Sequence, residues 1–322
     1  MKRFIALLLT MAFCLGLCAC GAPADNTPET TVSAAKKALD GKKVLIIGNS
    51  HTYVGRVVVH VSNSQPALTA RQNDMGLFYL ICQRNGIDVN VTNWCFSSHG
   101  LRSIFGESCT TEGACFGKNH VEYLTDRFYD YVVIQPGVGD KSEQNLVEDI
   151  ANIVDFFRKE NPDVKFALLG NASVYGNNAT NKPYPGITSY YKTLAEQDFI
   201  MADWGKLVND LIHQEVVPEG STIPYEKNSF IIKDGFHPNM LSGYIASMML
   251  FCAITGESAA EQAADLFADT VMTIMVEDQV ESSYIRGDMD TNMKTVLTTP
   301  SELARIHPLI DQYLADKPYL NN

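Results

Sequence analysis

The sequence predicts an α/β domain in which helices cover both faces of a parallel sheet of about five strands. Short apolar runs alternate along the chain with segments of helical period, and this alternation is typical of a parallel sheet. Several of the runs are continuous instead of alternating with polar residues, which indicates strands buried on both faces. Residues 256–322 have mostly helical patterns, and we expect them to form a C-terminal helical extension of the same domain.

The first strand is expected over 43–48, where an unbroken apolar run ends in a glycine. A helix follows over 75–84, and Asn85-Gly86 are residues that commonly close a helix. Residues 88–94 are expected to form the second strand and residues 131–135 the third.

The second half of the domain continues the alternation. A helix is expected over 146–159, because Leu146, Ile150, Ile153 and Phe157 lie along one face at helical spacing. The fourth strand is expected over 165–170. A weaker fifth strand covers 199–202, and a helix through 207–213 follows it.

The composition limits the classes of function. The chain has 322 residues, of which 46% are apolar, enough to bury a substantial core and too many for a disordered chain. Acidic residues outnumber basic ones, and the formal net charge is −12. A nucleic-acid-binding protein usually has a basic surplus, so we expect no nucleic-acid partner.

The N-terminus predicts export. Lys2 and Arg3 precede an apolar run over 4–17, which is the pattern of a signal peptide. The run ends in Leu17-Cys18-Ala19-Cys20-Gly21, which resembles a bacterial lipobox. That resemblance implies a signal peptide over 1–19, a lipid on Cys20 and an anchor at the outer face of a bacterial membrane. An ordinary signal peptide is the alternative. Residues 20–40 are expected to form a flexible tether, and residues 41–255 the main folded domain.

Eight cysteines occur in the chain, three of them in the leader region. Export permits disulfides, and Cys109 and Cys115 flank a short glycine-containing loop, so we predict this pair as a disulfide. The alternative is that every remaining cysteine is free, with Cys82 and Cys252 buried in the core.

Polar residues follow the first four predicted strands, at the edge where ligands of open α/β sheets bind. Gly48-Asn49-Ser50-His51-Thr52 follows the first strand, and Ser50 is there either a nucleophile or a helix cap. Gly100 lies beyond the second strand, where it either admits a ligand to the backbone or makes a turn. Gln135 ends the third strand and Asn171 follows the fourth; each offers a side-chain amide.

Asp234-Gly235-Phe236-His237-Pro238 occurs late in the chain. A carboxylate three residues before a histidine is able to fix the tautomer of the imidazole and leave Nε2 as a base. The alternative is an aspartate that caps a turn and a histidine packed on the surface.

Together these motifs resemble the SGNH (GDSL-like) hydrolase superfamily over residues 42–255. Gly48-Asn49-Ser50 stands near the start, Asp234 and His237 stand near the end, and Gly100 takes the place of the second-block glycine. The resemblance implies a flavodoxin-like three-layer α/β/α fold. It also implies Ser50 as nucleophile, His237 as general base and Asp234 as its partner, with no cofactor and no metal.

The resemblance further implies an oxyanion hole formed by the backbone N–H groups of Ser50 and Gly100 and by one side-chain amide. Two positions depart from the family. Asn49 replaces the usual aspartate, and Gln135 stands where the third-block asparagine is expected. We expect the Gln135 amide to supply the side-chain donor, with Asn171 in reserve.

The predicted function is ester hydrolysis at the cell surface, with removal of acetyl or other short acyl groups from a carbohydrate. Tyr53, Trp94 and Phe96 either form a sugar-stacking platform or belong to the core. The competing hypothesis is a non-catalytic surface lipoprotein that binds glycan or protein on a decayed hydrolase fold. A metal site built from His51, His99, Asp234 and His237 matches no known ligand spacing.

Overall fold

The computed structural model describes residues 33–59, 73–96, 100–102, 124, 126–136, 143–172, 187–221, 225–231, 237–264 and 300–320. The chain divides into two units, residues 1–33 and 34–322. All of the described helices and strands belong to the second unit.

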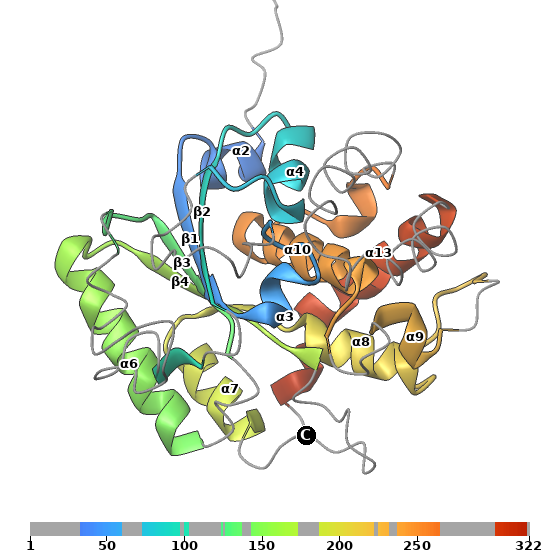
Figure 1. The fold of residues 1–322 in the computed structure, drawn as a ribbon. Coiled ribbons are helices and arrows are strands. Elements are labelled where there is room, and N and C mark those ends of the chain that lie inside the picture. Colours follow the sequence, from blue (N-terminus) through green and yellow to red (C-terminus); the bar gives the residue numbers. More distant parts are fainter. Residues whose placement is uncertain are drawn as a thin grey trace, which may run out of the picture. The chain divides into compact units, whose positions relative to one another are not determined.

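The centre of this unit is a single sheet of five parallel strands (Figure 1). Neighbouring strands in the sheet follow the order β2-β1-β3-β4-β5. This is the order of flavodoxin-like folds, in which ligands bind at the point where the strand order reverses, here between β1 and β3. The strands are β1 (Lys43–Gly48), β2 (Asn90–Cys95), β3 (Tyr131–Ile134), β4 (Lys165–Leu169) and β5 (Ile200–Ala202).

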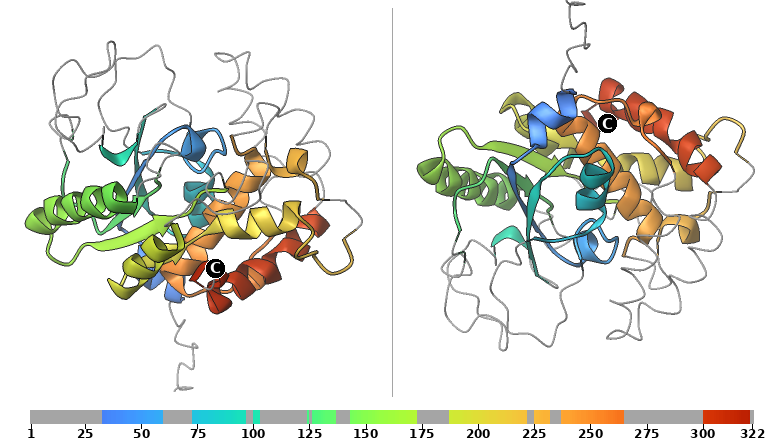
Figure 2. Two further views of the ribbon diagram at one scale, coloured as in Figure 1. Left: turned by 90° about the horizontal axis from the view of Figure 1, so that it is seen from below. Right: turned by 90° about the horizontal axis from the view of Figure 1, so that it is seen from above.

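Helices cover both faces of the sheet (Figures 1 and 2). One face is covered by α6 (Glu143–Glu160) and α7 (Ile187–Glu196). The short segments α9 (Lys227–Phe230), η3 (Ala259–Glu261) and η6 (Pro318–Leu320) complete the described elements. The other face is covered by α2 (Ala34–Leu39), α3 (Ser50–Tyr53), α4 (Leu77–Arg84), α8 (Trp204–Ile212), α10 (Met240–Thr255) and α13 (Pro300–Asp316).

The sheet separates two hydrophobic cores, because successive side chains of a strand point to opposite faces. In β1, Val44 and Ile46 belong to the larger core with α10, whereas Leu45 and Ile47 belong to the core beneath α6 and α7. Helix α10 is apolar almost all round and is buried along most of its length, as expected of a helix enclosed by other elements.

The α/β/α fold class and the five expected strands are confirmed, with bounds that shift by one or two residues. One expectation differs: residues 34–39, which we placed in the tether, form α2. Ala35 and Leu39 of that helix are buried against the larger core. Among the described helices, none is both long enough and apolar enough to cross a membrane.

The C-terminal helix α13 shares the larger core through Leu303, Ile306 and Ile310. It is also tied to α8 by polar contacts. The Tyr313 hydroxyl donates to Asp210, whose carboxylate accepts from Lys206 at 2.6 and 2.7 Å. Because these groups are largely buried, their contacts fix how α13 lies on α8. The domain boundary at residue 255 stays a prediction.

We expect Ile306→Ala to lower the free energy of unfolding by about 2–5 kcal/mol, because Ile306 is fully buried and its truncation leaves a cavity. Denaturant unfolding followed by circular dichroism measures this change. Gln312→Ala is the control, since Gln312 is an exposed residue of the same helix and its truncation should cost less than about 0.5 kcal/mol. Equal effects of the two substitutions would show that α13 is not part of the core.

Candidate active site

Ser50 is the first residue of α3 and lies just beyond the carboxyl end of β1. The preceding Asn49 caps this short helix: its side chain accepts a hydrogen bond from the backbone N–H of His51 at 3.0 Å. In return, the backbone N–H of Asn49 donates to the hydroxyl of Thr52 at 3.3 Å. This capping box fixes the turn around Ser50. Ser50 is therefore both the start of a helix and a side chain at the ligand-binding edge.

His237 lies just before α10, in a connection held on its C-terminal side. Pro238 pairs with Ile231 in an isolated antiparallel bridge, and the backbone N–H of Asn239 donates to the carbonyl of Phe230 at 2.8 Å. The Asn239 side chain accepts from the N–H of Ser242 at 3.2 Å and so caps α10. These bonds set the position from which the His237 ring extends.

The two predicted residues meet. Nε2 of His237 lies 2.8 Å from Oγ of Ser50, although 187 residues separate them in the chain. A serine hydroxyl in hydrogen-bond contact with an imidazole nitrogen is the arrangement of a nucleophile and its general base. The geometry therefore suits proton transfer from Ser50 to His237.

A second histidine lies beside this pair. The ring of His51 is buried, and its centroid is 5.0 Å from that of His237 at an interplanar angle of 32°. The sequence brought His51 forward only as the residue after Ser50 and as one candidate ligand of a metal site, so it was assigned no part in the esterase mechanism. In the structure it forms one wall against which the His237 ring packs.

Two glycines, Gly55 and Gly243, allow the turn after α3 to approach the start of α10 closely. This approach links the segment that contains Ser50 to the segment that follows His237. A Cβ added to Gly243, in the first turn of α10, would overlap the carbonyl oxygen of Gly55. A Cβ added to Gly55 would lie 3.3 Å from Cγ of Pro238, the residue after His237. Because neither glycine has a side chain, the turn after α3 and the start of α10 come into backbone contact. This contact helps to set the distance between Ser50 and His237.

The two candidate amide donors are both buried. The side-chain oxygen of Gln135, Oε1, accepts a hydrogen bond from the hydroxyl of Thr52, and its Nε2 donates to the backbone carbonyl of Gly170 at 3.1 Å. The Asn171 Nδ2 donates to the carbonyl of Pro136 at 3.4 Å. Each amide thus has partners within the protein, and its role as an oxyanion donor stays a prediction.

Gly100 lies beyond the end of β2, the strand paired with β1, and its oxyanion role also stays a prediction. Several other predicted residues lie outside the described part of the chain. These are Asp234 and His99 of the site, Cys20 of the lipobox, and the proposed disulfide pair Cys109 and Cys115.

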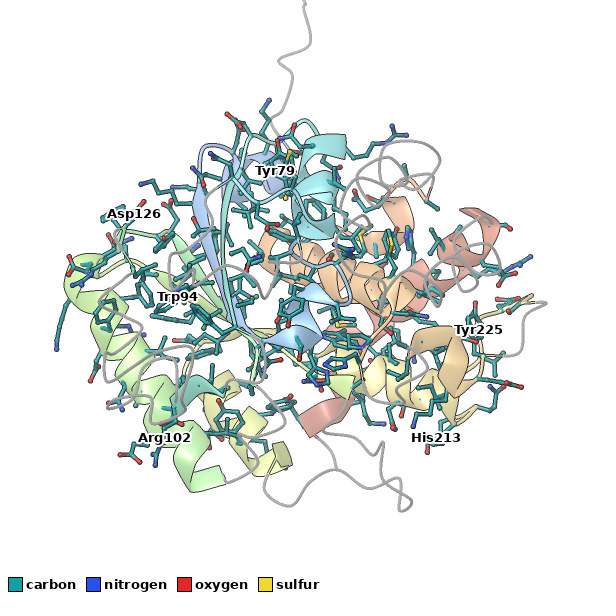
Figure 3. All side chains as sticks on the ribbon, viewed as in Figure 1. Tyr79, Trp94, Arg102, Asp126, His213 and Tyr225 are labelled. Carbon is teal, nitrogen blue, oxygen red and sulfur yellow. The ribbon has the colours of Figure 1, made fainter. Side chains whose placement is uncertain are left out.

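Two aromatic residues of the suggested sugar platform belong to the core. Tyr53 packs in the larger core. Trp94 packs on the opposite face of the sheet, in the core beneath α6 and α7 (Figure 3). Their side chains are 4% and 1% exposed, so neither presents a ring to a ligand. Phe96 is half-buried and meets Trp94 edge-on, with ring centroids 5.9 Å apart. The platform interpretation is wrong for Tyr53 and Trp94, whose apolar rings are better accommodated in the interior.

Cys82, Cys95 and Cys252 are free and buried. Burial raises the pKa of each thiol well above its usual range, so they remain protonated and unreactive at neutral pH. Within the described ranges, no cluster of three or more potential ligands is arranged to hold a metal ion.

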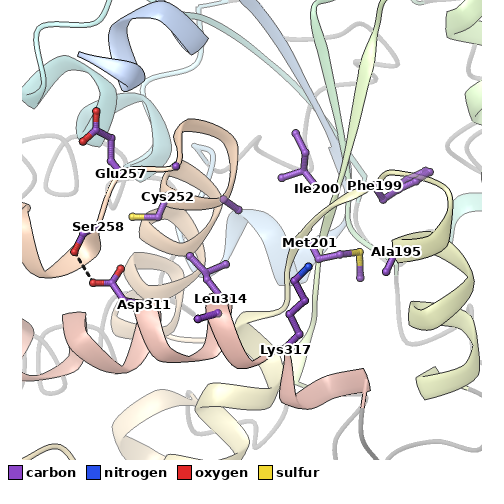
Figure 4. A pocket seen from close by; sticks show the side chains of 13 residues that line it. Ala195, Phe199, Ile200, Met201, Cys252, Glu257, Ser258, Asp311, Leu314 and Lys317 are labelled. Atoms are coloured by element: carbon purple, nitrogen blue, oxygen red, sulfur yellow. Dashed lines mark hydrogen bonds between the residues drawn. The ribbon is translucent and has the colours of Figure 1, made fainter.

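A cavity of about 590 Å³ lies beside the amino end of β5, between α10 and α13 (Figure 4). Its walls include Phe199, Ile200, Cys252 and Leu314, and Lys317 lies at its side. Neither Ser50 nor His237 lines it. This cavity is therefore separate from the contact between Ser50 and His237.

No family model and no curated protein sequence matches the chain. Solved structures do. An acetylxylan esterase from Geobacillus stearothermophilus is 16% identical with a TM-score of 0.43, and the match covers 69% of this chain and 97% of the esterase. A protein from Parabacteroides merdae, provisionally assigned as a GDSL-like lipase, is 14% identical with a TM-score of 0.43 over 68% of this chain and 97% of its own.

A protein from Slackia heliotrinireducens, provisionally assigned as an SGNH hydrolase, is 12% identical with a TM-score of 0.42 over 67% of this chain and 99% of its own. SGNH and GDSL-like hydrolases are thus among the proteins whose structures are similar to this chain. Because each of these TM-scores is below 0.5, the fold class rests on the strand order of the chain itself.

We expect Gly243→Ala to slow the reaction of Ser50 with a fluorophosphonate by about 10- to 100-fold, because the added methyl group forces α3 and α10 apart and lengthens the contact between Ser50 and His237. Labelling followed by mass spectrometry measures the rate. Gly86→Ala is the control: its backbone has positive φ, so the substitution is also strained, but the added Cβ meets no atom within 4 Å. Unchanged labelling in Gly243→Ala would show that the glycine contact does not set the geometry.

Proposed function

We propose that the chain is a serine-dependent ester hydrolase. The contact of 2.8 Å between Oγ of Ser50 and Nε2 of His237 carries this proposal. The same residues occupy the nucleophile and base positions of the SGNH motifs, so the geometry and the sequence support one assignment. The site lies at the carboxyl edge of the sheet, next to the strand-order reversal where flavodoxin-like folds bind ligands.

In this mechanism His237 accepts the proton of the Ser50 hydroxyl as Oγ attacks the ester carbonyl. The tetrahedral intermediate collapses, the alcohol leaves with the proton from His237, and an acyl group remains on Ser50. Water, deprotonated by His237, then attacks the acyl-enzyme and releases the acid. Following the family resemblance, Asp234 orients the imidazole, and the backbone N–H groups of Ser50 and Gly100 bind the oxyanion.

We further propose a short acyl group, such as acetyl, on a carbohydrate as the substrate. This proposal follows from the predicted place of the enzyme: a protein tethered by a lipid on Cys20 at the outer face of a bacterial membrane meets extracellular glycans. It does not rest on stacking by Tyr53 or Trp94, since both are buried.

Ser50→Ala should lower kcat/KM for a small acetyl ester by at least about 10³-fold and abolish fluorophosphonate labelling, because the substitution removes the hydroxyl that we propose as the nucleophile. His237→Gln should lower kcat by a similar factor while Ser50 remains present. Steady-state kinetics on the chain without residues 1–19 test both. Ile306→Ala serves as control, since it lowers stability through α13, a helix that contributes no residue to the proposed site.

A wild-type protein with neither labelling nor turnover would contradict the esterase proposal and favour the non-catalytic surface binder. Wild-type and Ser50→Ala proteins that hydrolyse the ester at equal rates would also contradict it.

Cys20→Ser should release the protein from the membrane fraction of a bacterium that expresses it, because the thiol that would carry the lipid is then absent. Fractionation and incorporation of a labelled fatty acid measure this. Cys18→Ser is the matched control: that residue lies on the cleaved side of the lipobox, and the protein should stay anchored. Equal release in both variants would refute a specific lipid on Cys20.

A further inference from the structure

We propose that Gln135 is a positioning residue, which holds the turn that carries Ser50 through the hydroxyl of Thr52 and is not the side-chain donor to the oxyanion. The inference rests on the proposed esterase function, and it assigns the residue that departs from the family pattern a role of its own. It is carried by a line of buried hydrogen bonds across the strand ends, from Thr52 after β1, through Gln135 after β3, to Gly170 after β4.

The orientation of the Gln135 amide follows from its partners. The carbonyl of Gly170 only accepts, so Nε2 of Gln135 must face it; this bond is 3.1 Å long. The opposite end of the amide is then Oε1, which accepts the hydroxyl hydrogen of Thr52. Oε1 and one of the two Nε2 hydrogens are engaged, and because Gln135 is 0% exposed the second hydrogen is also buried within the protein. Binding a substrate oxygen through the bonded N–H would leave the Gly170 carbonyl without this donor.

Gln135 is well anchored for such a role. Its backbone N–H donates to the carbonyl of Ile47 at 2.8 Å, which fixes the residue beside the end of β1. At the far end of the line, Gly170 lies so close to Asp203 that an added Cβ would overlap the carboxylate. The line therefore ends on backbone that has little room to move.

Thr52 connects the anchored Gln135 side chain to the turn that contains Ser50. The Thr52 hydroxyl accepts from the backbone N–H of Asn49 at 3.3 Å while it donates to Gln135. The Thr52 backbone N–H also donates to the carbonyl of Asn49 at 2.9 Å. Ser50 lies between these two residues, so both sides of its turn are tied to the sheet. Gly48 leaves the required space, because a Cβ there would overlap the Thr52 hydroxyl.

A double-mutant cycle separates positioning from oxyanion binding. Thr52→Val and Gln135→Leu each remove one side of the same hydrogen bond and keep much of the volume. If Gln135 acts through Thr52, both variants lower kcat by similar factors, about tenfold, with little change in KM, and the double variant is no worse than either single one. Thr52→Ser keeps the hydroxyl and should retain most of kcat.

The opposite result is equally definite. If Gln135 binds the oxyanion, Gln135→Leu should lose about 10²- to 10³-fold in kcat, Thr52→Val should lose far less, and the two losses should multiply. That pattern would overturn the proposal. Ile306→Ala controls for lost stability, because it lies in α13 and should leave kcat unchanged.

A measurement without turnover keeps this test distinct from that of the esterase. The ¹⁵N chemical shift of His237 Nε2 reports its hydrogen bond with Ser50. Thr52→Val and Gln135→Leu should change it in the same way, and Ile306→Ala should not. If the wild-type protein hydrolyses no ester but these shifts change together, only the proposed function fails. If neither variant alters the shift, the positioning role fails, whether or not the protein is an esterase.

Discussion

The site depends on the contact between Ser50 and His237, and its other contacts hold these two residues in position. It joins residues that are 187 positions apart, so no local preference of the chain forms it. One partner is fixed by the end of β1 and the first turn of α3, and the other by the connection into α10. Because a proton moves between hydrogen-bonded atoms only at short range, displacement of either element would disrupt the proposed proton transfer.

The two hydrophobic cores explain how such precision is held. Strand β1 lies inside the sheet, with aliphatic side chains buried on both faces, and its position is set by packing from α10 on one side and α6 on the other. Helix α10 is enclosed by the larger core, and Gly243 brings it against the turn that follows α3. Ser50 and His237 thus lie at the ends of two elements, β1 and α10, that are both packed into the larger core.

The sheet and the edge of the site were predictable because their signals are local. A continuous run such as residues 44–47 indicates a strand buried on both faces. Helix α2 was missed because a short segment rich in alanine and lysine resembles a linker until Leu39 is seen to pack against the core. Gln135 was found because it lies at the end of a predicted strand. The orientation of its side-chain amide was not predictable, because it depends on the Gly170 carbonyl and the Thr52 hydroxyl, which are brought to it by the pairing of β3 with β1 and β4. Nothing in the sequence around Thr52 predicted its role.

The length of the Gln135 side chain links its position to its role. Its backbone N–H donates a hydrogen bond to the carbonyl of Ile47 at the end of β1, so the side chain starts from a fixed point between β1 and β4. From that point its amide spans the gap between the Thr52 hydroxyl and the Gly170 carbonyl. Asparagine is one methylene shorter, so from the same backbone position its amide would not fill this span in the same way. If the proposed esterase function holds, this departure from the family pattern changes which residue holds the turn around Ser50, and the proposed roles of Ser50 and His237 are unaffected.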